Sequence, residues 1–130
     1  MSEPVIALDT NALMMPIEAD LDPFDELERL LGRVDPVVPQ AVRGELASLG
    51  ATGSSEEARA ARLGEQLADE RCRPMNHERD RADDALVELA EQGRIDYAVT
   101  NDAPLRERLH AVGLPVISLR GQNTLAVIHP

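Results

Sequence analysis

The sequence Val5-Ile6-Ala7-Leu8-Asp9 opens the chain with four apolar residues in a row, followed by a carboxylate. A strand with one solvated face alternates apolar and polar residues, whereas a strand buried on both faces is apolar throughout. We therefore predict that residues 5–8 form a strand of a parallel sheet that helices cover on both sides. Asp9 then marks the point at which this strand leaves the core.

Other segments of the chain end a helical pattern at a glycine and continue directly into apolar residues. A glycine supplies the left-handed conformation that closes a helix before the chain turns into a strand. The segment 72–75 is a weaker strand candidate without such a glycine. The glycines and the strands expected after them are Gly32 with 34–38, Gly93 with 95–99 and Gly113 with 116–119.

Helices are expected between these strands, where apolar residues recur at helical spacing behind a capping residue. Asp22 with Pro23 begins one such helix, and Asp102 with Pro104 begins another. The other helical segments are a short helical or looped stretch at 11–15, a helix at 40–49, a helix from a capping box at Ser54 and Glu57 to about Arg71, and a helix capped by Asp80.

Strands that alternate with helices along the whole chain predict an α/β fold with a central parallel sheet and right-handed crossovers. A length of 130 residues fits one domain, so we expect residues 1–130 to form a single unit. Ligands of such sheets bind at the carboxyl ends of the strands. Candidate functional residues are therefore expected at that edge.

Acidic residues from four separate segments are expected at or near this edge. Asp9 and Asp102 directly follow strands, Asp84 lies in the first turn of a helix, and Glu45 lies on the helix at 40–49. Each has a structural explanation alone, as an N-cap, a helix N-terminal acid or an exposed glutamate. Carboxylates that converge without basic partners repel one another, so the set together predicts a divalent cation site. Asp83 occupies the capping-box position relative to the expected cap at Asp80, so Asp84 is the preferred ligand of the pair.

The charge of the chain is strongly acidic, with a net charge of −11, no lysine, and arginine at all 13 basic positions. Acidity alone disfavours a nucleic-acid partner, because phosphate binding depends on basic residues. The combination of many acids with no lysine is also what a halophile's cytosol selects. Both interpretations, an acidic protein that avoids nucleic acid and a salt-adapted one, stay open. Phe24 and Tyr97 are the only aromatic residues, which excludes an aromatic base-stacking platform.

Cysteine content and the N-terminal sequence indicate the compartment. Cys72 is the only cysteine, so the chain forms neither an internal disulfide nor a cysteine-based zinc site. The N-terminus lacks a basic region before its apolar run, and no segment approaches the roughly 18 uninterrupted apolar residues of a membrane span. We therefore expect a cytoplasmic protein with no membrane partner.

The segments around the four acids resemble the acidic motifs of PIN-domain ribonucleases. In chain order they are Val-Ile-Ala-Leu-Asp9-Thr-Asn, Val-Pro-Gln-Ala-Val-Arg-Gly-Glu45-Leu, Ala-Asp-Asp84-Ala-Leu-Val-Glu-Leu-Ala and Ala-Val-Thr-Asn-Asp102-Ala-Pro-Leu. The resemblance covers nearly the whole chain. The stretch from Leu105 to Arg120 further resembles the archaeal branch related to eukaryotic rRNA-processing PIN nucleases, more than typical VapC toxins.

The resemblance implies a three-layer α/β/α domain that binds Mg²⁺ or Mn²⁺ and cleaves RNA endonucleolytically, with rRNA or tRNA as substrate. It further implies a ribosome-assembly factor or an antitoxin as protein partner. Asp9, Glu45, Asp84 and Asp102 would be the catalytic, metal-binding residues. The residues expected in supporting roles around the metal or the substrate are Thr10, Asn11, Asp83, Thr100, Asn101, Arg43 and Arg106.

Other interpretations of the same residues stay open. A non-cleaving RNA- or ribosome-associated module could keep the fold and the metal site without activity. A flavodoxin-like regulatory domain, in which Asp9 or the pair Asp83 and Asp84 receives or supports a phosphoryl group, is disfavoured because the chain has no lysine to support it. The apolar stretch Met14, Met15, Ile17 and Leu21 is equally suited to a homodimer surface and to the core.

Overall fold

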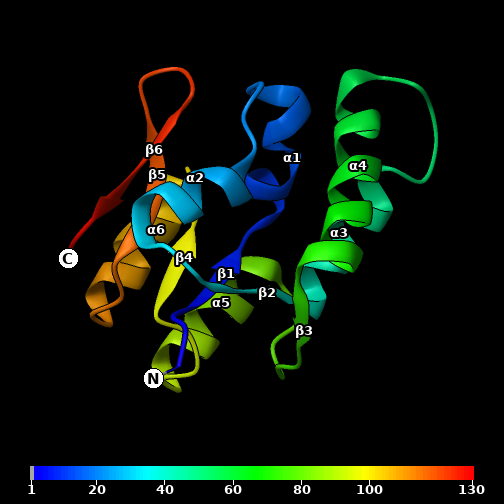
Figure 1. The fold of residues 1–130 in the computed structure, drawn as a ribbon. Helices are drawn as coiled ribbons and strands as arrows, with labels where there is room; N and C mark the ends of the chain where they lie inside the picture. The colour runs from blue at the N-terminus through cyan, green and yellow to red at the C-terminus, as the bar shows by residue number, and fades with distance from the viewer. Residues whose placement is uncertain (1) are drawn as a thin grey trace.

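A computed structural model describes residues 2–130, which fold around one six-stranded sheet (Figure 1). The spatial order of the strands is β3-β2-β1-β4-β5-β6. The first five strands are parallel to their neighbours, and β6 returns antiparallel to β5. The strands are β1 (Val5–Leu8), β2 (Asp35–Pro39), β3 (Arg73–Met75), β4 (Tyr97–Val99), β5 (Val116–Arg120) and β6 (Thr124–Ile128).

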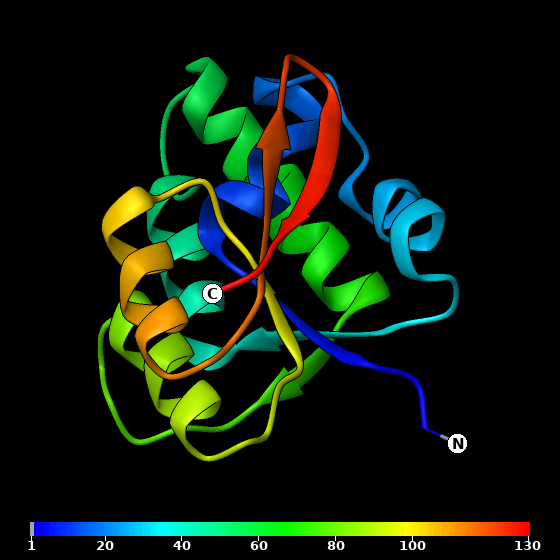
Figure 2. The same cartoon turned by 90° about the vertical axis from the view of Figure 1, so that its left-hand side faces the viewer.

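Helices cover both faces of the sheet and make a three-layer α/β/α arrangement (Figure 2). The helices are α1 (Thr10–Glu18), α2 (Pro23–Leu31), α3 (Gln40–Leu49), α4 (Glu56–Arg71), α5 (Ala82–Glu91) and α6 (Ala103–Ala111). Apolar residues of α1, α2, α3 and α4 form the core on one face, and those of α5 and α6 form the core on the other. The predicted fold class is confirmed, with β6 as an antiparallel addition.

The opening strand shows why its sequence is apolar throughout. Ile6 and Leu8 lie in the core on the α1 side of the sheet, while Ala7 lies in the core on the α5 side, and none of the three is exposed to solvent. This alternation follows from the two-residue period of a strand. Because β1 lies in the middle of the sheet, Asp9 lies at the centre of the edge that the carboxyl ends of the parallel strands form.

Most predicted elements are present, but several helix starts differ from the prediction. Asp9 caps α1, so residues 10–18 form a full helix where only a short helical or looped stretch was expected. Ser55, one residue later than predicted, caps α4 by accepting the Ala58 amide at 3.1 Å. The N-cap of α5 is Arg81, not Asp80, and this helix has no side-chain cap. The predicted caps of α2 at Asp22 and of α6 at Asp102 are confirmed.

The apolar stretch after the first acidic motif belongs to the core. Met14 and Met15 are each 2% exposed, and Leu21 is 5% exposed. Ile17 is partly buried and packs against the same core. The structure therefore places this stretch in the core, the second of its two expected roles. Within residues 2–130, no helix combines the length and the hydropathy that a membrane crossing requires.

Helices α1 and α4 approach each other very closely at Gly64. A Cβ atom placed on Gly64 would lie 2.8 Å from the Leu13 carbonyl oxygen and 3.1 Å from Cδ2 of Leu46. Only the absence of a side chain permits this approach. The packing of α4 on α1 and α3 therefore requires glycine at position 64.

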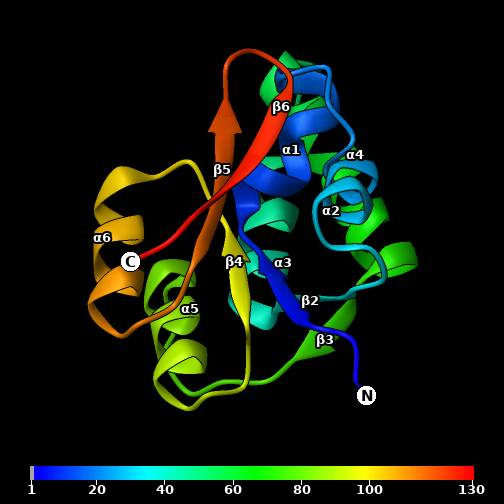
Figure 3. The same ribbon diagram turned by 60° about the vertical axis from the view of Figure 1, so that its left-hand side comes forward.

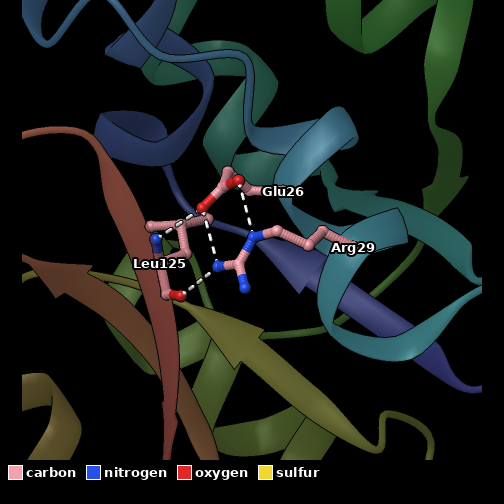
Figure 4. A network of polar contacts seen from close by, with 3 residues as sticks. All are labelled: Glu26, Arg29 and Leu125. Carbon is pink, nitrogen blue, oxygen red and sulfur yellow. Dashed lines mark hydrogen bonds and ion pairs between the residues drawn. The ribbon is translucent and has the colours of Figure 1, made fainter.

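The outer edge of β6 is bonded to side chains of α2 (Figure 4). Glu26 Oε1 accepts the Leu125 amide at 2.8 Å, and Arg29 Nη2 donates to the Leu125 carbonyl at 2.9 Å. Glu26 and Arg29 also form an ion pair with each other at 2.9 Å. The amide and the carbonyl of Leu125 thus bond to side chains of α2. In the interior of a sheet, a neighbouring strand would supply these two hydrogen bonds.

Candidate active site

Strands β1 and β4 run side by side in the sheet and deliver the first and last acidic motifs to the same edge (Figure 3). A cavity of about 710 Å³ lies at this edge, at the carboxyl ends of the strands. Its walls come from the N-terminal parts of α1, α5 and α6 and from one side of α3. The residues that line it are Asp9, Thr10, Asn11, Ala41, Gly44, Glu45, Ser48, Asp80, Arg81, Ala82, Asp83 and Asp102. Segments up to 93 residues apart in sequence therefore share one cavity.

Asp9 is the most buried acid of this cavity, at 6% exposure. As the N-cap of α1 it accepts the Ala12 amide at 2.7 Å. Burial raises the pKa of Asp9 to about 6, hydrogen bonds from the Thr100 side chain and the Ala12 amide oppose this rise, and the neighbouring charges of Asp83 and Asp102 add to it. Asp9 is thus a buried carboxylate with negative neighbours.

Asp102 reaches the same cavity from the end of β4. It caps α6 by accepting the Leu105 amide at 2.9 Å, which explains its position at a helix start. Its own amide donates to Thr100 Oγ1 at 3.1 Å. Since the Thr100 side chain also bonds to Asp9, this fully buried threonine joins the two acids.

The predicted supporting residues divide into those that line the cavity and those that hold its frame. Thr10 and Asn11 line the cavity. Asn101 lies outside it and accepts the Leu119 amide at 2.8 Å, so it joins the end of β4 to β5. Arg43 also lies outside the cavity lining, in an ion pair with Asp69 of α4, and Arg106 is absent from the lining as well.

The two adjacent acids of α5 are placed opposite to the sequence-based preference. Asp83 lines the cavity, whereas Asp84 lies outside the lining and pairs with Arg108 of α6 at 2.8 Å. This ion pair, with smaller contributions from Arg81 and Arg79, lowers the pKa of Asp84. The prediction placed the helix cap at Asp80, but the helix begins after Arg81. Successive residues of a helix point in directions about 100° apart. When the helix starts one residue later than predicted, Asp83 points into the cavity and Asp84 points away from it.

Comparison with known proteins agrees with this fold. The family model described as a PIN-like domain matches residues 6–122. The chain belongs to the PIN-like domain family. The resemblance inferred from the acidic motifs is thereby confirmed.

Solved structures of PIN domains superpose on this PIN-like domain. The PIN domain endonuclease Utp24 is 25% identical with a TM-score of 0.79, over 97% of this chain and 92% of that chain. VapBC2 from Rickettsia felis, solved bound to a DNA fragment from its promoter, is 16% identical with a TM-score of 0.56, over 89% of this chain and 99% of that chain, and this likeness concerns the fold alone. No curated protein matches the sequence.

The donor atoms in the cavity of the PIN-like domain suit a hard divalent cation. Asp9, Glu45, Asp83 and Asp102 offer only oxygen, which Mg²⁺ and Mn²⁺ prefer. The Thr10 Oγ1 atom is buried without a hydrogen-bond partner. Within residues 2–130, however, no three acidic, histidine or cysteine side chains lie close enough to enclose an ion together. Mg²⁺ keeps several of its waters in proteins and often binds through only one or two carboxylates.

Sequence reasoning did not assign Asp80, Arg81 and Ser48 to the cavity. Asp80 was expected to be a helix cap and Arg81 a solvated residue. Both lie in the segment that precedes α5, so their place at the site depends on where that helix begins. Ser48 lies one turn beyond Glu45 on α3, and i,i+3 spacing was the one signal that could have placed it on the same side.

Proposed function

We propose that this PIN-like domain is a metal-dependent endoribonuclease. The observation that carries the proposal is the environment of Asp9, a buried carboxylate whose pKa is raised to about 6 and whose charged neighbours in the cavity include Asp83 and Asp102. Such a group destabilises the fold unless a cation neutralises it. A cost of this kind at the carboxyl end of a parallel sheet is typical of a functional site.

In this proposal Asp9, Asp83, Asp102 and Glu45 hold Mg²⁺ or Mn²⁺. When bound, the cation supplies positive charge to the phosphodiester and lowers the pKa of water at the site. Asp9 and Asp102 are fixed in place by their capping bonds to the Ala12 and Leu105 amides, so they meet a cation without rearrangement of their helices. The Thr100 hydroxyl accepts the main-chain amide of Asp102 and also bonds to the Asp9 carboxylate, so it ties Asp9 to the main chain at the end of β4.

The proposed substrate is RNA, with rRNA or tRNA as the specific classes. The likeness to the endonuclease Utp24 over nearly the full length of both chains supports cleavage. The resemblance of the stretch from Leu105 to Arg120 to the branch related to rRNA-processing PIN nucleases supports a role in RNA processing beside a ribosome-assembly partner. A VapC-like toxin role with an antitoxin partner has weaker support, because the similarity to VapBC2 is lower. The acidic, lysine-free composition supports a salt-rich cytoplasm, as in a halophilic archaeon, as the working environment.

Cleavage assays with single-residue variants test this function. The purified protein is incubated with labelled single-stranded and structured RNA in MnCl₂, in MgCl₂ and in EDTA. We expect cleavage in the divalent salts only, and a loss of about 100-fold or more in Asp9→Asn and Asp83→Asn, because each removes a carboxylate from the cation site. Asp84→Asn is the matched control, since it changes the adjacent residue in the same way outside the cavity and should keep most of the activity.

Two outcomes would contradict the proposal. Cleavage that persists in EDTA and in Asp9→Asn would exclude a metal-dependent site at this cavity. Equal losses in Asp83→Asn and Asp84→Asn would contradict the assignment of Asp83. Calorimetric titration with MnCl₂ gives a second readout, in which Asp83→Asn weakens the binding of the metal more than Asp84→Asn.

A second candidate is a non-cleaving RNA-associated module. The family match concerns the fold, and a fold can persist where the activity has been lost. The two candidates differ in turnover: the module would bind RNA and Mn²⁺ without producing cleavage products at any protein concentration.

A further inference from the structure

The inference concerns how an acidic protein holds an RNA backbone at this cavity, and it rests on the proposed function. The chain carries a net charge of −11, and at least four carboxylates line the cavity. A phosphodiester that approaches this edge needs a basic side chain placed locally, since the net charge of the molecule opposes it. The positions of the 13 arginines therefore decide where the backbone can lie.

Most arginines are already committed to other groups. Ion pairs occupy five of them, namely Arg29, Arg43, Arg73, Arg79 and Arg108. Arg62 and Arg94 donate to main-chain carbonyls, and Arg71 lies over the Phe24 ring at 4.5 Å. Both basic residues predicted as substrate contacts fit poorly, because Arg43 is bound to Asp69 and neither it nor Arg106 lines the cavity.

Arg81 differs from all of these. It is the one basic residue among the described residues that line the cavity, and its side chain is exposed. Although Asp80 and Asp83 lie near it in the sequence and line the same cavity, its guanidinium forms no ion pair with any residue between 2 and 130. An arginine that stays unpaired among several carboxylates keeps all its donors available to a ligand.

The surroundings of Arg81 also favour an anion. Arg81 is the N-cap of the ten-residue helix α5, and no side chain caps that helix, so its first amides have no side-chain acceptor. The N-termini of α1 and α6 at the same cavity are capped by Asp9 and Asp102. Independently, Thr10 lines the cavity at 6% exposure with its Oγ1 atom unpartnered. The cavity therefore offers unpaired donors from two elements, the N-terminus of α5 and Thr10 of α1.

The acid of α5 that lies just outside the cavity is already neutralised. Asp84 is paired with Arg108 of α6 at 2.8 Å, and Arg79 lies near it in an ion pair with Glu91 at 3.4 Å. Asp84 therefore does not compete with a phosphate for Arg81.

We propose that Arg81 binds a backbone phosphate of single-stranded RNA at the mouth of the cavity, with the uncapped N-terminus of α5 beside it. The guanidinium donates to two phosphate oxygens, a geometry to which its planar fork is matched. The neighbouring phosphate of the same strand then lies over the acids. Arg81 positions the substrate and takes no part in proton transfer.

RNA binding without cleavage tests this assignment. The probe is a fluorescently labelled 12-nucleotide single-stranded RNA, titrated in EDTA so that no cation contributes, and its anisotropy gives the Kd over a series of KCl concentrations. Arg81→Ala should weaken binding by about tenfold and reduce the slope of log Kd against log salt by about 0.7, the effect of one lost phosphate contact on a single strand. Arg81→Lys should restore part of the affinity, because it restores the charge without the fork.

Arg59→Ala is the matched control, because it removes the same charge from an exposed position on α4 outside the cavity. It should leave both Kd and the salt slope nearly unchanged. The inference is overturned if Arg81→Ala and Arg59→Ala behave alike, or if the wild-type protein does not bind the RNA. If Arg81→Ala weakens binding but the wild type never cleaves RNA in MnCl₂, Arg81 retains its role and the proposed nuclease function fails. If the wild type cleaves RNA in MnCl₂ but Arg81→Ala binds the RNA as tightly as the wild type, the nuclease function stands and the role of Arg81 fails.

Discussion

Asp9 serves two purposes with conflicting energetic consequences. Its carboxylate caps α1, which stabilises the fold, but its burial beside Asp83 and Asp102 raises its pKa from the ordinary value of 3.8 to about 6. The folded state therefore binds the Asp9 proton more tightly than the unfolded state does. The contribution of Asp9 to stability is greatest below the unfolded pKa and is lost as the pH rises through the folded pKa.

This conflict predicts that Asp9→Asn is more stable than the wild type at pH 7 in EDTA. An asparagine keeps an oxygen to accept the Ala12 amide and removes the buried charge. A shift of about two pKa units corresponds to about 3 kcal/mol, so we expect the free energy of unfolding to rise by about 1–3 kcal/mol. Urea denaturation at pH 7 measures the gain.

At pH 4 the carboxyl of folded Asp9 is protonated, and the difference between the two proteins should largely disappear. A variant that is less stable than the wild type at pH 7 would show that the hydrogen bonds of the charged carboxylate outweigh its burial. Saturating Mn²⁺ should raise the stability of the wild type and leave Asp9→Asn nearly unchanged.

The glycines of two neighbouring helices give a prediction at the scale of the element. Gly64→Ala should lower the free energy of unfolding by about 1–3 kcal/mol, because its Cβ would lie 2.8 Å from a main-chain oxygen of α1 that cannot move cheaply. This loss outweighs the gain of about 1 kcal/mol in helix propensity.

Gly44→Ala on α3 is the matched control, since nothing lies within 4 Å of its Cβ position. It should stabilise the protein by up to about 1 kcal/mol through helix propensity alone. Thermal or urea denaturation of both variants provides the test, and a stabilised Gly64→Ala protein would contradict the close packing of α1 on α4.

Much of this element arrangement could be predicted from local sequence. Asp22-Pro23 and Asp102 fixed two helix starts because a capping carboxylate and a first-turn proline act through their immediate neighbours. The predicted start of α5 was wrong, because Asp80 has the same local pattern as a helix cap. The segment before α5 is held instead by Glu88, which accepts the Glu78 and Arg79 amides at 2.8 and 2.9 Å. That contact spans nine or ten residues, so a capping pattern does not reveal it.

The antiparallel strand β6 was also not predicted. Its residues 124–128 follow a turn at Gly121, but the expected alternation of strands and helices had already ended with β5.

The candidate site could likewise be predicted only in part from the sequence. Asp9 and Asp102 follow strands and could be placed from topology, whereas Asp83 and Arg81 depend on the rotation of one helix about its axis.

The charge of the whole molecule predicts how its stability responds to salt. With 24 acidic and 13 basic residues, the compact state suffers more self-repulsion than the expanded chain. Raising KCl from 0.1 to 2 M shortens the screening distance from about 10 Å to below about 3 Å. We expect the Tm to rise by several degrees, which calorimetry in buffered KCl would detect.

Sorbitol solutions that match the water activity of the KCl series separate charge screening from general solvent effects. An equal rise in Tm with sorbitol, or a Tm that does not change with KCl, would contradict the role of self-repulsion. RNA binding should respond in the opposite direction, since phosphate contacts weaken as salt rises.

The bond pattern at Leu125 affects how this molecule meets copies of itself. Glu26 and Arg29 imitate a neighbouring strand, one as acceptor and the other as donor. An incoming strand would have to displace this carboxylate–guanidinium pair before it could add beside β6. At the opposite end of the sheet, β3 has three residues with Pro74 in the middle, which lacks an amide hydrogen. Fibrillar growth by strand addition is therefore obstructed at both ends, even at the high protein concentrations of a crowded cell.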